Sequence, residues 1–345
     1  MTGLGNYSRD LVNTLCKQFP DNKYFLFDKN PTTLDLPGNT IAVVPVGNRM
    51  LWRTTGMLKD VRRFRLDVFH GLSNGLPWGR WPSSVKKVVT IHDVIFNVFP
   101  EQYSPIDRMI YTRKTTHAVK TADIIVATSQ ATVADLVRHY KVDPSKIKVV
   151  YQTCGVGHWQ DYSRSAVEEF RRRRQLGENF ILYVSSFETR KNHMALLKAF
   201  DMLNDRNATL VLAGRERETY AGCVKFVREK DLGKRIKFLT DISNAELPLL
   251  YRSAQSFVYP SMVEGFGIPL IEAACAGLPM ATSDIPVFRE IAPEGTLFFR
   301  DSDVANMAGV LNELMKKSTQ SYAGHLAKFT PSHAASEMMQ IYKDQ

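Results

Sequence analysis

The chain contains no uncharged apolar run of about eighteen residues or more, the length that a membrane-spanning helix needs. Its amino terminus also lacks the basic region and apolar run of a secretory signal peptide. These absences predict a cytoplasmic protein. At 345 residues the chain is longer than most single hydrophobic cores, so we expect two domains.

The four cysteines are far apart in the sequence and form no CxxC pair, which argues against a zinc site or a disulfide framework. We expect buried, unreactive thiols and no metal site. No GxGxxG motif follows a strand, which disfavours a nicotinamide-dependent dehydrogenase. Known nucleic-acid-binding modules are also absent, so we expect no nucleic-acid partner.

The net charge of +10 is unevenly distributed. Residues 1–179 hold 26 Lys and Arg against 16 Asp and Glu, whereas residues 180–345 hold 19 of each. The excess in the first half indicates an anionic partner, such as a membrane surface or a phosphorylated lipid.

Short runs rich in β-branched residues recur along the chain, and each is followed by a helical pattern. This alternation is typical of parallel sheets covered by helices. The predicted strands are residues 24–27, 41–46, 68–69, 88–91, 124–127 and 147–150 in the first half, and 180–184, 209–213, 236–238, 256–259, 279–282 and 296–299 in the second.

The stretch between the two series has little strand character, so we expect a domain boundary there. The predicted layout is an N-terminal domain over 1–155, a linker over 156–178, a C-terminal domain over 179–330, and a helix over 331–345 that crosses back to the N-terminal domain. The four arginines at 171–174 are interpreted as a solvated helix face in the linker.

The most informative segment is residues 260–274, which follow a predicted strand and lead into a helix. Gly265 and Gly267 let the backbone approach a ligand closely, and Pro269 suits the first turn of the helix. The helix start offers free N–H groups to an anion. Glu264 and Glu272 would repel a bare phosphate, so we interpret them as acceptors for sugar hydroxyls beside it.

Glu264 and Glu272, separated by seven residues and enclosing Gly-Phe-Gly-Ile-Pro, resemble the hallmark of the retaining glycosyltransferase family numbered four. The similarity also includes Gly-Leu-Gly-Asn-Tyr at 3–7, Thr-Ile-His-Asp at 90–93, the segment 183–192, Leu-Ala-Gly at 212–214, and 246–251. It implies the GT-B fold: two Rossmann-like α/β domains with parallel sheets facing a central cleft. Bacterial mannosyltransferases of surface polysaccharide assembly are the most similar in character.

The resemblance implies a role for each matching residue. Glu264 would contact hydroxyls of the donor hexose, Glu272 the ribose, and Lys191 the donor diphosphate with help from Arg190. A lysine suits that place because it neutralises charge on the leaving nucleoside diphosphate. The implied donor set is completed by Gly3, Gly5, Gly265, Phe266, Gly267 and Ile268. Many relatives have Gly-Arg where this chain has Ser185-Ser186, which we interpret as a subfamily difference.

His92 and Asp93 directly follow a predicted strand, where open α/β sheets place ligands. By resemblance His92 lies near the reaction centre, and a histidine bonded to backbone is the alternative. We assign Asp93 to the acceptor side. His70, at another strand end, either faces the acceptor as well or has a purely structural role. In relatives a strand precedes the glycine loop that contains Gly3 and Gly5, whereas this chain starts two residues before Gly3. We therefore expect a missing first strand or an altered strand order.

Residues 48–67 interleave six basic side chains with apolar ones, including a tryptophan. Such a stretch can lie in a membrane interface. A surface helix whose apolar stripe faces its own core explains the pattern equally well. The first interpretation predicts peripheral contact with the inner face of the cell membrane.

The resemblance implies transfer with retention of configuration, from GDP-mannose or a UDP-hexose, to a glycan or a polyprenyl- or lipid-linked acceptor. No nucleophilic carboxylate is identified, so we favour same-side attack assisted by the leaving phosphate. We expect no cofactor and no catalytic metal, and interpret Asp301 and Asp303 as helix-capping residues. Two alternatives stay open: a sugar-nucleotide epimerase, which needs no acceptor, and a catalytically silent nucleotide-sugar-binding partner.

Overall fold

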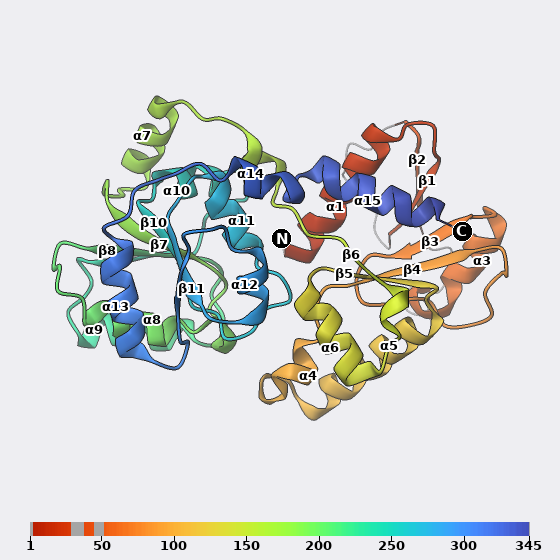
Figure 1. The fold of residues 1–345 in the computed structure, drawn as a ribbon, viewed down its shortest axis with the longest axis horizontal. Helices are drawn as coiled ribbons and strands as arrows, with labels where there is room; N and C mark the ends of the chain where they lie inside the picture. The colour runs from red at the N-terminus through yellow and green to blue at the C-terminus, as the bar shows by residue number, and fades with distance from the viewer. Residues whose placement is uncertain (1–2, 29–37, 45–51, 345) are drawn as a thin grey trace. The chain divides into compact units, whose positions relative to one another are not determined.

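The computed structural model describes residues 3–28, 38–44 and 52–344, which divide into two compact units. The first unit is Met1–Thr153 with Lys328–Gln345, and the second is Cys154–Ala327. Each unit contains parallel strands and helices (Figure 1). Among the described residues, no helix combines the length and the apolar character that crossing a bilayer demands.

A parallel six-stranded sheet forms the centre of the second unit, in the order β12-β11-β10-β7-β8-β9. Its strands are β7 (Phe180–Val184), β8 (Thr209–Ala213), β9 (Ile236–Leu239), β10 (Ser256–Tyr259), β11 (Met280–Ser283) and β12 (Leu297–Phe299). The helices are α7 (Arg164–Arg173), α8 (His193–Asp201), α9 (Tyr220–Glu229), α10 (Leu247–Ser253), α11 (Ile268–Cys275), α12 (Pro286–Ile291), α13 (Val304–Leu314) and α14 (Ala323–Leu326). Every residue of β10 and β11 is buried, as expected for a parallel sheet covered on both faces.

The first unit contains a parallel four-stranded sheet in the order β3-β4-β5-β6 and a separate parallel pair, β1-β2. The strands are β1 (Tyr24–Phe27), β2 (Thr40–Val43), β3 (Val68–Gly71), β4 (Lys86–Ile91), β5 (Ile124–Ala127) and β6 (Ile147–Val149). The helices are α1 (Gly3–Gln18), α3 (Met57–Arg63), α4 (Ile95–Val98), α5 (Pro105–Thr121), α6 (Gln130–Tyr140) and α15 (Pro331–Lys343).

Successive side chains of the central strands point to opposite faces of the sheet, so the core of this unit has two parts. Val88 and Val126 point to the face where α1 and α15 lie against each other. Val89 and Ile125 point to the opposite face and meet α3, α5 and α6. The sheet is therefore covered on both sides, which explains the apolar character of β4 and β5.

The strands β1 and β3 border a gap in the first unit. Among the described residues no backbone ladder joins them, and residues from both line a cavity of about 1570 Å³. All four residues of β1, Tyr-Phe-Leu-Phe, are only half-buried, although parallel strands with such side chains are usually buried on both faces. We refer to this region as the β1–β3 gap.

The predicted α/β class is confirmed, and each predicted strand coincides with a strand of the structure to within two residues at each end that is described. Residues 45 and 46 of the run 41–46 lie outside the described residues. The β-branched runs located the strands because these side chains pack well on a pleated, buried surface.

The prediction of a linker over 156–178 was wrong. This segment belongs to the second unit, and its helix α7 packs against α10. The arginine run is not simply solvated either: Arg174 makes ion pairs of 2.7 Å to both Glu246 and Asp241. The run was misinterpreted because its carboxylate partners lie about seventy positions further along the chain.

The membrane-facing interpretation of 48–67 was also wrong for the described part of the segment, which starts at residue 52. Trp52, Met57, Leu58 and Val61 are buried in the core of the first unit. The indole N–H of Trp52 donates to Asp60 at 2.9 Å. The apolar stripe therefore faces its own core, and the exposed side chains of the described part are polar or charged.

Candidate active site

The chain order of the second sheet reverses between β7 and β10. Its first strand, β7, pairs with β8 on one side and with β10 on the other. In open α/β sheets, ligands bind beyond the carboxyl ends of the strands at such a reversal. Lys191 follows β7 and Glu264 follows β10, so the two predicted donor-binding residues extend from the strands that flank this point.

The side chains of Lys191, Glu264 and Arg190 form one buried cluster. The Lys191 ammonium donates to one carboxylate oxygen of Glu264, and Arg190 Nη1 lies 3.0 Å from the other. The side chains of Lys191 and Glu264 are only 10% and 9% exposed. Arg190 also pairs with Glu188 at 3.1 Å. The structure therefore brings together three residues that were predicted from two separate segments, 183–192 and 260–274.

Protonation of this cluster follows from its geometry. Burial alone would raise the pKa of Glu264, but the adjacent Lys191 and Arg190 outweigh it and hold this pKa at about 2. Burial lowers the pKa of Lys191, while the Glu264 carboxylate acts in the opposite direction. Glu264 is thus a carboxylate at neutral pH, an acceptor for hydroxyl groups and not an acid.

Two tyrosines hold this cluster in place, and neither was predicted. Tyr259, the last residue of β10, donates to Glu264 at 2.9 Å. Tyr183 of β7 donates to the backbone carbonyl of Lys191 at 2.6 Å. Both rings are fully buried, and burial raises the pKa of both hydroxyls. An aromatic residue with a polar tip at a strand end was the available sequence signal.

Between Glu264 and α11, the chain passes through the glycine loop. Gly267 has φ +119° and precedes the first residue of the helix, Ile268. A Cβ at Gly267 would lie 2.8 Å from the Phe288 ring, so only glycine fits. Phe266 is buried and Gly265 is half-buried. The helix begins one residue before Pro269, as the sequence indicated.

Glu272 lies on α11 and is held by groups from other segments. Tyr251 of α10 donates to Glu272 Oε2 at 2.7 Å, and His158 Nε2 lies 3.5 Å from Oε1. Burial lowers the pKa of His158. His158 could not be predicted from the sequence, because a lone histidine between two series of strands belongs to no recognisable pattern.

Small residues bring β7 and β8 together beside this cluster. Gly214 follows β8 with φ +154°, and a Cβ there would lie 1.9 Å from the Ser185 carbonyl oxygen. Ser186 donates to Glu188, the partner of Arg190, at 2.7 Å. Ser186 is therefore connected to the cluster of Lys191, Arg190 and Glu264 through Glu188.

In the first unit, His92 follows β4, but its ring is enclosed. Its Nε2 lies 2.8 Å from the Leu72 carbonyl oxygen, and Nδ1 lies 2.6 Å from the Gln152 side-chain nitrogen. Because a carbonyl only accepts and an amide N–H only donates, Nε2 carries the proton and the ring is neutral. Burial lowers the pKa of His92, which agrees with that state. The backbone-bonded interpretation describes the observed contacts, and a catalytic role for His92 stays a prediction.

The acceptor-side residues also have internal partners. Both ring nitrogens of His70 are engaged, by Tyr342 at 2.6 Å and Thr90 at 2.8 Å, and burial lowers its pKa to about 3. The ring therefore bridges β3, β4 and α15, and the prediction that it faces an acceptor is not supported. The Asp93 carboxylate accepts from the Ile95 backbone N–H at 3.2 Å, at the start of α4.

The glycine loop predicted near the amino terminus is not a loop, because α1 begins at Gly3 and includes Gly5. Tyr7, Leu11 and Leu15 recur at four-residue spacing and are buried against α15 and the sheet, which favours a helix through this segment. The second acidic residue of the pair at 301–303, Asp303, accepts from the Asn306 backbone N–H at 2.9 Å, which confirms it as the N-cap of α13.

Three of the four cysteines are buried and all are free thiols. Cys154 Sγ lies 3.6 Å from Cys275 Sγ. Burial raises the pKa of Cys154 well above its usual range, which makes it a poor nucleophile. The prediction of buried thiols thus holds for Cys16, Cys154 and Cys223, whereas Cys275 is half-buried.

Each unit is an α/β unit built on parallel strands, and the second has a buried cluster of two cations and a carboxylate beside a glycine loop at its strand reversal. These features fit the GT-B class of glycosyltransferases. Residues 2–153 match Glycosyltransferase Family 4, and residues 166–329 match Glycosyl transferases group 1. The chain therefore belongs to the glycosyltransferases, with a Family 4 domain followed by a group 1 domain.

Two relatives illustrate its similarities. The chain is 25% identical over 349 residues to O-antigen chain mannosyltransferase B of Escherichia coli, covering 94% of this chain and 90% of that protein. It is 28% identical to O-antigen chain mannosyltransferase RfbU of Salmonella typhimurium, over 63% of this chain but only 57% of the relative.

Solved structures support the same fold. Sucrose-phosphate synthase from Thermosynechococcus elongatus is similar with TM-score 0.76, at 20% identity over 99% of this chain and 93% of that one. WaaG, a glycosyltransferase involved in lipopolysaccharide biosynthesis, has TM-score 0.73 at 14% identity, covering 100% and 97%. At these identities the likeness shows the GT-B fold alone.

Proposed function

We propose that this glycosyltransferase moves a mannosyl group from a nucleotide diphosphate sugar, with GDP-mannose favoured over a UDP-hexose. The observation that carries the proposal is the buried contact of Lys191 and Arg190 with Glu264 at the β7–β10 reversal. Two cations beside one carboxylate suit a ligand with a diphosphate next to a hydroxylated ring. Mannose is favoured by the names of the O-antigen relatives.

The proposed roles follow from what each group can donate or accept. Lys191 and Arg190 neutralise charge that develops on the leaving diphosphate, and the N–H groups at the start of α11 add to this. Glu264 accepts hydrogen bonds from sugar hydroxyls. Glu272, positioned by Tyr251, accepts from the ribose hydroxyls. This charge arrangement requires no metal ion in the proposed mechanism.

The proposed stereochemical outcome is retention. A double displacement needs a free carboxylate at the anomeric carbon. Glu264 is engaged by two cations, and its pKa of about 2 describes a weakly basic group. We therefore favour departure of the diphosphate and attack by the acceptor hydroxyl on the same face, with the departing phosphate accepting the proton.

The donor class can be tested by thermal-shift titration with GDP, UDP, GDP-mannose and UDP-glucose. A ligand that binds only the folded protein raises the midpoint. We expect the largest shift with GDP-mannose and its loss in Lys191→Ala and Glu272→Ala. Lys198→Ala, which changes an exposed lysine of the adjacent helix α8, is the matched control and should keep the shift. Equal shifts in Lys191→Ala and the control would contradict the assigned site.

The acceptor is proposed to be a lipid-linked or polysaccharide glycan. The enzyme can be incubated with GDP-mannose, with and without a polyprenyl-linked acceptor, and the products analysed by NMR. This experiment tests the acceptor and the retention of configuration. Transfer that depends on the acceptor and gives the donor's anomeric configuration supports the proposal. Conversion of the nucleotide sugar without an acceptor indicates an epimerase, and donor binding without turnover indicates a silent partner.

A further inference from the structure

Exposed apolar side chains are concentrated at one place in the first unit. Of the eleven large hydrophobic residues that are exposed in the described part of the chain, six belong to α5 or lie beside it. Three of them recur at helical spacing on α5: Ile106, Met109 and Ile110 are 66%, 64% and 52% exposed. The three in the second unit, Val156, Met202 and Val224, are far apart in sequence.

The amino-terminal half of α5 extends from the body of the unit. Every residue from 104 to 111 is exposed, and the buried positions begin only at Thr115. Ser104 caps the helix by accepting from the Asp107 backbone N–H at 3.1 Å, so these exposed turns are ordered. A row of exposed apolar side chains along one face of a helix is unusual for a surface covered only by water.

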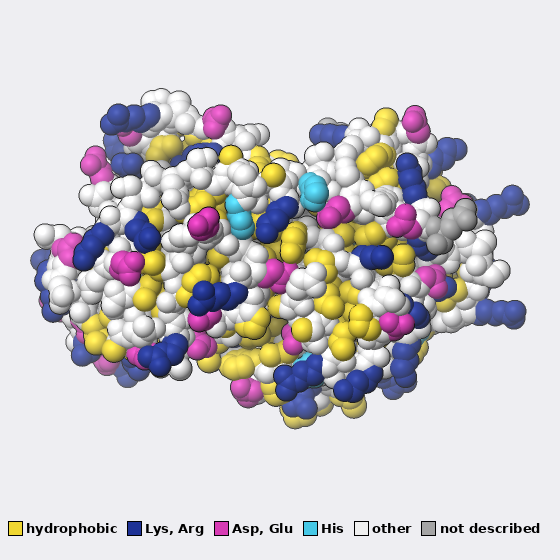
Figure 2. Space-filling view, viewed as in Figure 1, with side chains coloured by type: hydrophobic (Ala, Val, Ile, Leu, Met, Phe, Trp, Pro, Cys, Tyr) yellow, Lys and Arg dark blue, Asp and Glu magenta, His cyan; other side chains and the backbone are white. Residues whose placement is uncertain are grey.

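Neighbouring segments extend the apolar area along the helix. Val98, 40% exposed, lies on α4, which packs against α5. Trp78 is 36% exposed and stacks on His117 of α5 with ring centroids 3.7 Å apart. We refer to Trp78, Val98, Ile106, Met109 and Ile110 as the α5 surface. In Figure 2, apolar atoms and Lys or Arg atoms lie next to each other over the region of α4 and α5.

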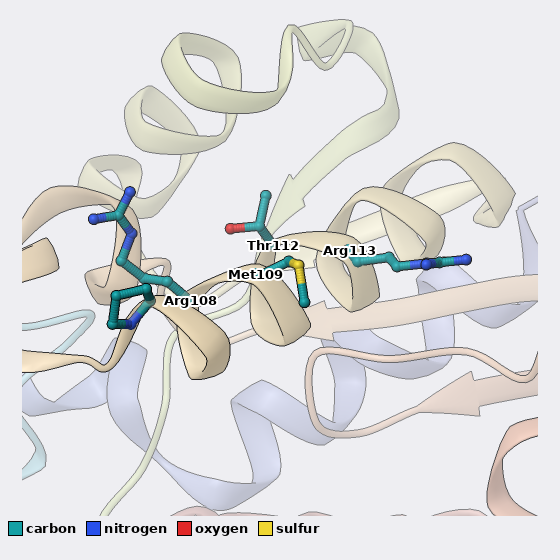
Figure 3. A pocket seen from close by; sticks show the side chains of 5 residues that line it. Arg108, Met109, Thr112 and Arg113 are labelled. Atoms are coloured by element: carbon teal, nitrogen blue, oxygen red, sulfur yellow. The ribbon is translucent and has the colours of Figure 1, made fainter.

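Basic side chains flank this surface. Figure 3 shows Arg108 and Arg113 extending in opposite directions on either side of Met109. A hollow of about 380 Å³ lies along the helix here, lined also by Pro105 and Thr112. Besides these arginines, α5 carries Lys114 and Lys120, with Asp107 as its one acidic residue. Two arginines beside a shallow hollow suit a phosphate group.

We propose that the α5 surface binds a membrane with anionic headgroups: the apolar side chains enter the headgroup region, and Arg108 and Arg113 pair with lipid phosphates. A protruding apolar helix with basic flanks is what an interfacial helix requires. A second copy of the chain fits less well, because a twofold contact would bring the same arginines against each other. This inference concerns lipid contact and does not depend on the proposed sugar transfer.

The test is co-sedimentation of the full chain with vesicles of phosphatidylcholine alone or mixed with phosphatidylglycerol at about two to one. We expect binding to the mixed vesicles. Replacing both Arg108 and Arg113 by glutamine should weaken it about twenty-fivefold, about fivefold per charge. The triple variant Ile106→Ser, Met109→Ser, Ile110→Ser should weaken it about tenfold or more.

The matched control is Met202→Ser with Val224→Ser, which removes exposed apolar side chains from the second unit and should leave vesicle binding unchanged. Thermal midpoints and GDP-mannose shifts of all variants, measured without vesicles, show whether the fold and the donor site are intact. Equal vesicle binding by the triple variant and the wild type would overturn the proposal. So would a wild-type dimer that the triple variant converts to a monomer, because the α5 surface would then be a self-association site.

Discussion

The central sheets of the two units arise from similar sequence patterns but differ in completeness. In the second unit six strands pair without a break, and the strand reversal at β7 and β10 carries the candidate site. Among the described residues of the first unit, the β1–β3 gap separates two sheets, and the apolar strand β1 is only half-buried. Strand formation and strand pairing are therefore specified separately: the local sequence pattern determines where a strand forms, and long-range neighbours determine which strand it pairs with.

The largest expected effect comes from truncating the same residue type in the two sheets. Phe257 of β10 is fully buried, so Phe257→Ala should lower the free energy of unfolding by about 3–5 kcal/mol. Phe25 of β1 is half-buried beside the gap, so Phe25→Ala should cost about 1–2 kcal/mol. Both losses of unfolding free energy can be measured by urea-induced unfolding, with amide hydrogen exchange monitored separately in each unit. Equal costs would mean that the gap does not weaken the packing around β1.

The next effect concerns activity and compares Lys191 of the candidate site with His92 of the first unit. Lys191→Ala should lower kcat/KM by about 10²–10³, because it removes positive charge facing the developing negative charge. His92→Gln removes a ring whose nitrogens both have protein partners, so we expect mainly a lower thermal midpoint. Kinetics normalised to folded protein distinguish the two. A comparable loss of kcat/KM in His92→Gln with an unchanged midpoint would place His92 at the reaction centre.

Buried histidines give a matched pH test. Burial lowers the pKa of His70 in the first unit and of His193 in the second to about 3. The unfolded chain takes up protons near pH 6.5, so stability should fall as pH decreases from about 6.5 towards 3 and stay level above it. Each histidine contributes at most about 1.4 kcal/mol per pH unit. His70→Gln and His193→Gln should each reduce this slope in unfolding experiments at several pH values. A slope unchanged in both variants would contradict neutral buried rings.

The smallest effects concern helix caps. Ser104 caps α5 in the first unit, and Asp303 caps α13 in the second. Replacing either residue by alanine should lower the free energy of unfolding by about 1 kcal/mol. In Ser104→Ala the loss should appear as faster amide exchange at the exposed start of α5, and in Asp303→Ala at the start of α13. Unchanged exchange in both would show that neighbouring contacts hold these helix ends without the caps.

Much of the fold was predictable because its signals are local. Strands such as β5 and β7 are short apolar runs with helical patterns after them, and the glycine loop around Gly267 has a composition that only a tight turn requires. The resemblance to Family 4 implied that Lys191 and Glu264 belong to one site although 73 positions separate them. In the structure each follows a strand of the same parallel sheet, and the carboxyl ends of parallel strands meet at one edge.

The remainder depended on contacts that no local pattern records. The sequence did not indicate that Arg174 pairs with Glu246 or that His70 lies between Tyr342 and Thr90. It left open whether Trp52 faces the core or a membrane. The α5 surface was also missed, because its apolar residues look like any amphipathic helix until the structure shows them exposed. For a basic or apolar side chain, the sequence gives the chemistry, whereas the partner depends on the fold.

The burial of the Lys191–Glu264 pair determines how strongly the affinity for the donor depends on salt concentration. Mobile ions screen exposed charges over about 8–10 Å at physiological salt, but they reach buried pairs poorly. With both side chains at most 10% exposed, this contact is shielded from the surrounding electrolyte. A donor that replaces Glu264 as the partner of Lys191 exchanges one shielded contact for another. Its affinity should therefore change little between low and high salt, unlike that of a ligand held by surface charges.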